Sequence, residues 1–194
     1  MSLIKMKRIS EIRRIGRDID MNNPGGLFIP RQEFNSYGES EKLIRYITRT
    51  RKQERQEKDL ISFGGRGVQV SSGIETVIKQ FKQVQGLYEI RFREYGRHCY
   101  HEYYCLNDQY SKLLDEESMD ELAYQLSQIY WEKGHQVIYA VHCPDKSGNS
   151  YHIHFAVNAI CLRNGHKWNT RNRDRKRRED RFNGITKKFV DGQC

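Results

Sequence analysis

The stretch YHIHFAVN, residues 151–158, constrains the fold more than any other part of the chain. Apolar residues recur at every second position, which is typical of a β-strand whose side chains point alternately to its two faces. Four apolar side chains share one face, while His152, His154 and Asn158 share the other face with an alanine. The strand therefore places two imidazoles side by side on an otherwise apolar segment.

A second strand is predicted at residues 136–143, and it ends close to His142. The segment PDKSGNS joins it to the strand at 151–160, and its turn-forming residues indicate an antiparallel hairpin. Such a hairpin brings His142 to the face that carries His152 and His154. A single strand histidine is usually an ordinary hydrogen-bonded residue. Three neutral imidazoles that converge on one point can instead bind a metal ion and leave positions open for water or substrate.

The remaining elements complete an α+β fold, in which helices pack against an antiparallel β-sheet. Residues 99–106 are predicted as a third strand, and the segment after Pro24 as a possible edge strand. Residues 64–70, GGRGVQV, are expected to form a glycine-rich loop. Three helices are predicted from apolar periodicity and from N-terminal serines, namely Ser40 and the capping boxes Ser72–Glu75 and Ser118–Glu121.

The chain has 194 residues, which suits one domain. We expect a core domain at 36–165, a basic N-terminal segment at 1–35 and a basic C-terminal segment at 166–194. The formal net charge is +9, which favours polyanionic partners. Residues 163–181 hold nine Lys or Arg against three Asp or Glu. This run is typical either of an arm that faces nucleic acid or of a solvated loop.

The five cysteines form no CxxC pair and no disulfide framework, which fits a reducing compartment. The N-terminal residues lack the apolar core of a signal peptide, and no run approaches membrane-spanning length. We therefore expect a cytoplasmic protein without membrane insertion.

The histidine region resembles a known motif. His142, followed by CPDKSGNSY and HIHFAVN, is similar to the third motif of conjugative relaxases of the HUH endonuclease superfamily, and FAVN is most similar to the MOBP branch of mobilisation nickases. The resemblance implies that His142, His152 and His154 hold a divalent ion, Mg²⁺ or Mn²⁺, with Zn²⁺ as an alternative. Asp145 and Asn158 are candidates for orienting these ligands.

The resemblance also implies a tyrosine nucleophile. LIRYITR is similar to the first relaxase motif, and Tyr46 takes the position of the tyrosine that attacks the scissile phosphate. Without this match, Tyr46 would be taken for a packed residue. YHEYYCL is similar to the second motif, with Cys105 where serine is usual. The rival nucleophiles are Tyr100, Tyr103, Tyr104 and Tyr110.

Basic and aromatic residues near these motifs are candidates for DNA binding, although a solvated basic face is the plainer interpretation for most of them. Some flank the predicted nucleophile and the others follow the metal strand: Arg45, Arg49, Arg51, Lys52, Trp168, Arg171 and Arg173. Trp168 is expected to stack on unpaired bases.

Taken together, the motifs predict a relaxase that nicks one strand of a transfer origin, stays attached through Tyr46 and later religates. Its expected partners are single-stranded origin DNA, accessory mobilisation proteins and a coupling protein of a conjugative secretion system. Two alternatives stay open. One is a rolling-circle replication initiator or HUH transposase, although these usually place the tyrosine after the histidines. The other is a non-catalytic DNA-binding protein with structural zinc, which usually has cysteine ligands.

Overall fold

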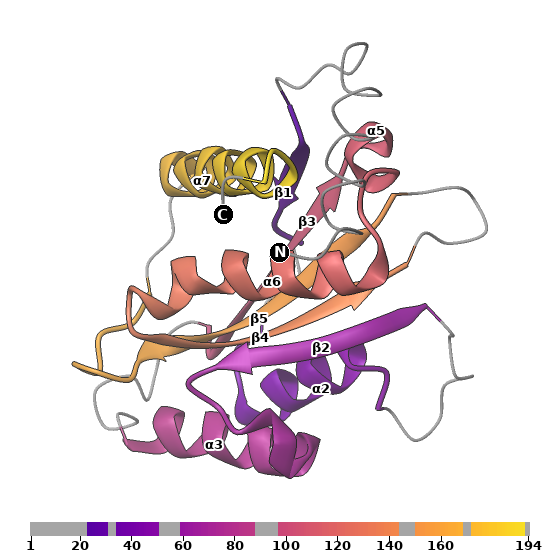
Figure 1. Cartoon of the computed structure of the whole chain (residues 1–194). Coiled ribbons are helices and arrows are strands. Elements are labelled where there is room, and N and C mark those ends of the chain that lie inside the picture. Colours follow the sequence, from indigo (N-terminus) through magenta and orange to yellow (C-terminus); the bar gives the residue numbers. More distant parts are fainter. Residues whose placement is uncertain are drawn as a thin grey trace.

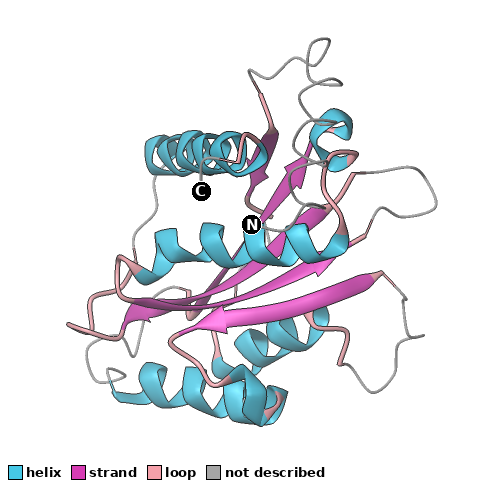
Figure 2. Cartoon of the chain, viewed as in Figure 1, coloured by secondary structure: helices cyan, strands magenta, loops and turns pink. Residues whose placement is uncertain are grey.

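The computed structural model describes residues 23–30, 34–50, 59–87, 97–143, 150–168 and 172–192. In this part of the chain, five strands and several helices form an α+β fold (Figures 1 and 2). In chain order the elements are β1 Gly25–Phe28, α2 Tyr37–Ile47, β2 Leu60–Arg66, a 3-10 turn at Val70–Ser72, α3 Ile74–Leu87, β3 Cys99–Leu106, α5 Asp108–Ser111, α6 Glu116–Trp131, β4 His135–His142, β5 His152–Cys161 and α7 Asn172–Val190.

The sheet has the strand order β1-β3-β5-β4-β2, and every neighbouring pair is antiparallel. The predicted hairpin is confirmed: β4 pairs with β5, and His142 lies opposite His152. The expected glycine-rich loop is wrong for its first three residues, because Gly64, Gly65 and Arg66 complete edge strand β2. A side chain at Gly64 would collide with the Tyr139 hydroxyl on β4, so the glycine allows the two strands to approach.

Helices cover both faces of the sheet (Figure 1). Helices α6 and α7 pack on one face, where they bury a core that includes Tyr104, Phe155 and Phe182. Helices α2 and α3 pack on the other face around Ile138, Ala140 and other small or apolar side chains. Alternation in β4 and β5 assigns the three histidines to this second face, beside α2.

The helix starts differ from the predictions by a few residues. Ser36, not Ser40, caps α2 by accepting a hydrogen bond from the Glu39 backbone, and Ser40 is buried one turn later. Asp115 caps α6 by accepting from the Ser118 backbone, so this helix begins earlier than its apparent capping box. In both cases a second polar residue one turn upstream is the better-placed acceptor, which the apolar periodicity does not reveal.

The basic C-terminal run forms helix α7 rather than a loop over residues 172–190. Arg178 of α7 forms a fully buried ion pair with Glu102 of β3, and the Tyr130 hydroxyl also donates to Glu102. Glu179 accepts a hydrogen bond from the Leu27 backbone at 3.0 Å, which covers the free edge of β1. Within the described residues, no helix is long and apolar enough to span a membrane.

Candidate metal centre and nucleophile

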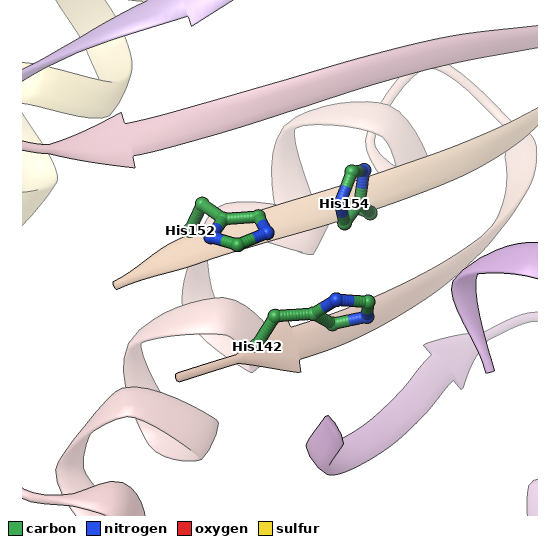
Figure 3. A group of neighbouring side chains, drawn as sticks. All are labelled: His142, His152 and His154. Carbon is green, nitrogen blue, oxygen red and sulfur yellow. The ribbon is translucent and has the colours of Figure 1, made fainter. Parts of the chain in front are cut away.

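Three imidazoles converge at one end of the β4–β5 hairpin (Figure 3). One potential ligand atom from each of His142, His152 and His154 lies within 4.8 Å of the other two. The ring centroids of His142 and His154 are 4.7 Å apart, and those of His152 and His154 are 5.0 Å apart. His142 and His154 are buried while His152 is half-buried, so the group opens toward solvent on the His152 side.

Burial keeps the imidazoles of His142 and His154 neutral. It lowers the pKa of His142 to about 4, and it places the pKa of His154 well below its usual value, with help from the neighbouring histidines. A neutral imidazole has one N–H and one lone pair, and the lone pair is the metal ligand. The donor set therefore fits a divalent ion, because small ring rotations would bring the three nitrogens to metal-bonding distance.

His101 on β3 belongs to this site, although the sequence analysis did not select it. Its Nε2 lies 2.8 Å from Nδ1 of His154, and burial together with the charge of His142 lowers its pKa to about 4. If His154 donates its Nδ1–H to His101, its Nε2 lone pair is left for an ion. Alternation in β3, the strand that carries the second motif, was the available signal, because His101 and Tyr103 share one face of it.

Arg49 and Asp59 form a charged pair beside His142. Arg49 Nη2 lies 2.5 Å from Asp59 Oδ2 and 3.1 Å from His142 Nδ1, and Asp59 Oδ2 is 3.2 Å from the same nitrogen. Burial raises the pKa of Asp59, but the hydrogen bond from Arg49 and the nearby charges more than offset this, so its pKa lies below the usual value. Asp59 is thus an orienting partner of His142 that the sequence analysis did not select, while Asp145, the residue expected in that role, lies outside the described ranges.

The end of helix α2 contributes to the same site through its backbone. Ile47 O lies 2.8 Å from His142 Nε2. Both ring nitrogens of His142 therefore have protein partners, and an ion bound at His142 replaces one of these contacts. Arg49 has a φ of 53°, and Thr50 N–H donates to Arg45 O, as in a Schellman motif with a left-handed residue after the cap. This position usually holds glycine.

Tyr46, in the last turn of α2, lies next to the histidines. Its ring centroid is 6.0 Å from that of His154, and the Arg49 guanidinium lies 5.1 Å from its ring centroid. Tyr103 is equally close, with its centroid 5.6 Å from His154. The other rivals are buried away from the histidine face: the hydroxyl of Tyr100 donates to Trp168 O, that of Tyr104 to Asn183, and Tyr110 is in the α6 core. The geometry therefore leaves Tyr46 and Tyr103 as nucleophile candidates.

The residues expected to bind DNA are scattered. Arg49 is at the site, whereas Arg45 pairs with Glu41 and Glu75 on the α2–α3 surface. Trp168 is only 8% exposed and packs in the α6 core, a placement that does not support stacking on bases. Arg173 is exposed on α7. Arg51, Lys52 and Arg171 lie outside the described residues.

Asn158 shares the histidine face but does not reach the three imidazoles. Its side-chain amide donates to Phe81 O of α3 and to Gln136, and its oxygen accepts from the Ile160 backbone. These bonds fasten α3 to the sheet. The contacts support a structural role and not the expected orientation of the metal ligands.

Comparison with known proteins agrees with this geometry. A family model matches residues 46–190, and its description is "Relaxase: MobA/VirD2-like, nuclease domain". The matched region begins at Tyr46 and includes all three histidines as well as α7. No curated protein gives a significant match. The family match favours a relaxase over a replication initiator, a transposase or a structural zinc protein. The chain belongs to the MobA/VirD2-like relaxase nuclease family.

Proposed function

We propose that the protein nicks one strand of a transfer origin by transesterification, with Tyr46 as the nucleophile. The observation that carries the proposal is the placement of Tyr46 beside three converging imidazoles in a relaxase nuclease domain. The Tyr46 oxygen forms a bond to phosphorus while the bond to the 3′ oxygen breaks. The phenol proton passes to water, and the departing 3′ oxygen takes up a proton. Because the phosphodiester energy is kept in the new bond, the reverse reaction rejoins the strand.

The chain's own residues have defined parts in this step. A phenol is largely protonated at neutral pH, so the attacking oxygen must be stabilised as it loses its proton. The Arg49 guanidinium lies over the Tyr46 ring and supplies positive charge there, while Asp59 holds the guanidinium in place. His142, His152 and His154 would hold a divalent ion, which would supply positive charge to the nonbridging phosphate oxygens.

The donor set also predicts an order of metal affinity. Imidazole nitrogen suits Zn²⁺ better than Mg²⁺, and affinity generally rises from Mn²⁺ to Zn²⁺. We therefore propose that binding tightens from Mg²⁺ through Mn²⁺ to Zn²⁺. Mn²⁺ is the ion to test first for activity, because it combines nitrogen ligation with an open coordination shell. Single-stranded origin DNA is the proposed substrate, and accessory mobilisation proteins and a coupling protein remain proposed partners.

The test compares Tyr46→Phe with Tyr103→Phe. Wild-type protein with Mn²⁺ is incubated with single-stranded oligonucleotides that tile the DNA element carrying its gene, and adducts are resolved on a denaturing gel. Tyr46→Phe should reduce adduct formation about 1,000-fold or more, because the substitution deletes the oxygen that attacks the phosphate and leaves the ring in place. Tyr103→Phe should form adduct normally. The opposite result assigns the reaction to Tyr103, and a lack of adduct with wild-type protein on every tile refutes nicking.

A further inference from the structure

An aromatic pair, of which Phe28 is exposed and Tyr103 half-buried, lies beside the histidines on the same sheet face. Phe28 on edge strand β1 is 47% exposed, although its ring stacks on Tyr103 with centroids 5.2 Å apart and planes 17° from parallel. Single exposed apolar residues are common on protein surfaces and need no function. The pair differs because of where the strand register places it.

The register forms a continuous row across three strands. Phe28 lies opposite Tyr103, and Tyr103 lies opposite His154. Directly opposite residues of antiparallel strands have side chains on the same face, so the row runs from the exposed edge to the metal ligands. Two strand spacings of about 4.8 Å place Phe28 on the order of 10 Å from His154.

The neighbouring row explains why the Phe28 ring lies over the site. Gly26, Cys105 and His152 are opposite one another in this row. A Cβ on Gly26 would lie 3.1 Å and 3.2 Å from Cε2 and Cζ of Phe28. The missing side chain at Gly26 therefore leaves room for the ring to lean along the sheet toward the row that contains His152, the half-buried ligand.

Helix α7 fixes the backbone that carries Phe28. Leu27 N–H donates to Glu179 at 3.0 Å, and Arg175 donates to Leu27 O at 2.8 Å. The Leu27 side chain is itself fully buried under α7. One ring face of Phe28 is covered by Tyr103, and the strand below it is held from behind. The pair is thus a preformed flat apolar surface, which a planar ligand can meet with little ordering cost.

We propose that Phe28, supported by Tyr103, is a base-stacking platform for an unpaired nucleotide next to the scissile phosphate. The inference rests on the proposed nicking of single-stranded DNA, which supplies the ligand class. Stacking suits this place because the two side chains offer a π surface and no charge, while the phosphate is held one or two nucleotides away at the histidines. Base–aromatic stacking is tolerant of sequence, so this platform would add affinity at any origin sequence.

The first test measures the affinity for a mixed-sequence single-stranded oligonucleotide. Phe28→Ala should weaken binding about 5- to 150-fold, the range for loss of one stacking aromatic. Phe28→Leu should weaken binding nearly as much as Phe28→Ala, because leucine is apolar but has no π surface. Phe28→Trp should retain the wild-type affinity, because tryptophan keeps a π surface. The matched control is Tyr124→Ala, since Tyr124 is also 47% exposed but lies on α6 on the opposite face; its affinity should equal that of wild type.

The second test locates the stacked base with 2-aminopurine, which loses fluorescence when it stacks. The fluorophore is placed at successive positions of an adduct-forming oligonucleotide. Quenching at one position near the cleaved bond should disappear in Phe28→Ala and return in Phe28→Trp. If wild type forms adduct but Phe28→Ala binds as tightly as wild type, or Phe28→Leu does, the platform is wrong and nicking stands. If wild type forms no adduct but the Phe28 series still changes affinity, nicking fails while a single-strand stacking site remains.

Discussion

Strands β3, β4 and β5 bury polar side chains on both faces of the sheet, but the two faces satisfy them differently. Under α6 and α7, Glu102 and Arg178 are paired with each other, and Tyr130 completes the bonding. Under α2, four histidines contact one another, and burial keeps His101, His142 and His154 neutral, while His152 is half-buried. The first face is closed by partners within the chain. On the second face an added ion can bind imidazole nitrogens, and at His142 it does so by replacing a contact within the chain.

This contrast separates stability from function. A buried ion pair contributes little when intact but leaves an uncompensated charge when one partner is removed. Buried neutral imidazoles give up hydration, and binding of an ion that prefers the folded site can offset part of that loss. We therefore expect changes on the α6–α7 face to act on the free energy of unfolding, and changes on the α2 face to act on ion affinity.

The largest effect is expected on the closed face. Arg178→Met should lower the free energy of unfolding by about 3–5 kcal/mol, because it strands the Glu102 carboxylate in the core. Chemical denaturation followed by circular dichroism measures this change. The double variant Glu102→Leu, Arg178→Met should recover much of the loss. Its ion affinity should equal that of wild type, and an ion affinity that falls with the pair would break the separation of the two faces.

Acid should act through the open face. The pKa of His142 is about 4 in the folded protein, whereas an exposed histidine, as in the unfolded chain, has a pKa of 6.5. The pKa of His101 is lowered by the same amount. Between these values the unfolded chain binds more protons than the folded one, so stability falls as pH decreases from 6.5 to 4. Each histidine corresponds to about 3 kcal/mol over that range. Denaturation midpoints in metal-free buffer at pH 7, 6, 5 and 4 measure the slope, and His101→Phe should flatten it; a flat wild-type profile would contradict buried neutral histidines.

The smallest effect concerns ion affinity alone. His101→Phe keeps a ring of similar size but removes the partner of His154 Nδ1. Loss of such an orienting contact usually weakens metal binding 10- to 100-fold, or about 1.4–2.7 kcal/mol. Calorimetric titration with Mn²⁺ measures it. His135→Phe is the matched control, because His135 is also a buried strand histidine but bonds the Asn158 carbonyl and packs on Trp168. An equal loss in both variants would show a general packing effect.

The fold was predictable where a segment has one clear period. Strand β3 was predicted with its observed bounds, and β4 and β5 to within one residue. Helix starts were not, since Ser36 and Ser40, or Asp115 and Ser118, are equally good caps until tertiary packing selects between them. Edge strand β2 was missed because its two glycines resemble a loop. Gly64 is required by the close approach of Tyr139, and a Cβ at Gly65 would collide with the Val137 carbonyl and the Val68 side chain.

The candidate site was predictable to the extent that it lies within one hairpin. His142, His152 and His154 converge because β4 and β5 are adjacent in sequence and in space. His101, Asp59 and Phe28 come from three other segments, and only the strand order places them nearby. Trp168 is an example of a residue that was expected at the site but lies elsewhere. Its position after the metal strand suggested the DNA face, but the turn after β5 carries it beneath α7.

The left-handed backbone at Arg49 implies that selection for heat resistance and selection for activity act differently on this position. An arginine in this conformation costs about 1 kcal/mol relative to glycine, which adopts it without a steric penalty. The same backbone conformation places the Arg49 guanidinium in contact with Tyr46, Asp59 and His142. A library screened for DNA transfer should therefore retain arginine at position 49. In a screen for melting temperature alone, glycine would relieve the backbone but lose the ion pair with Asp59, so neither residue should be strongly enriched.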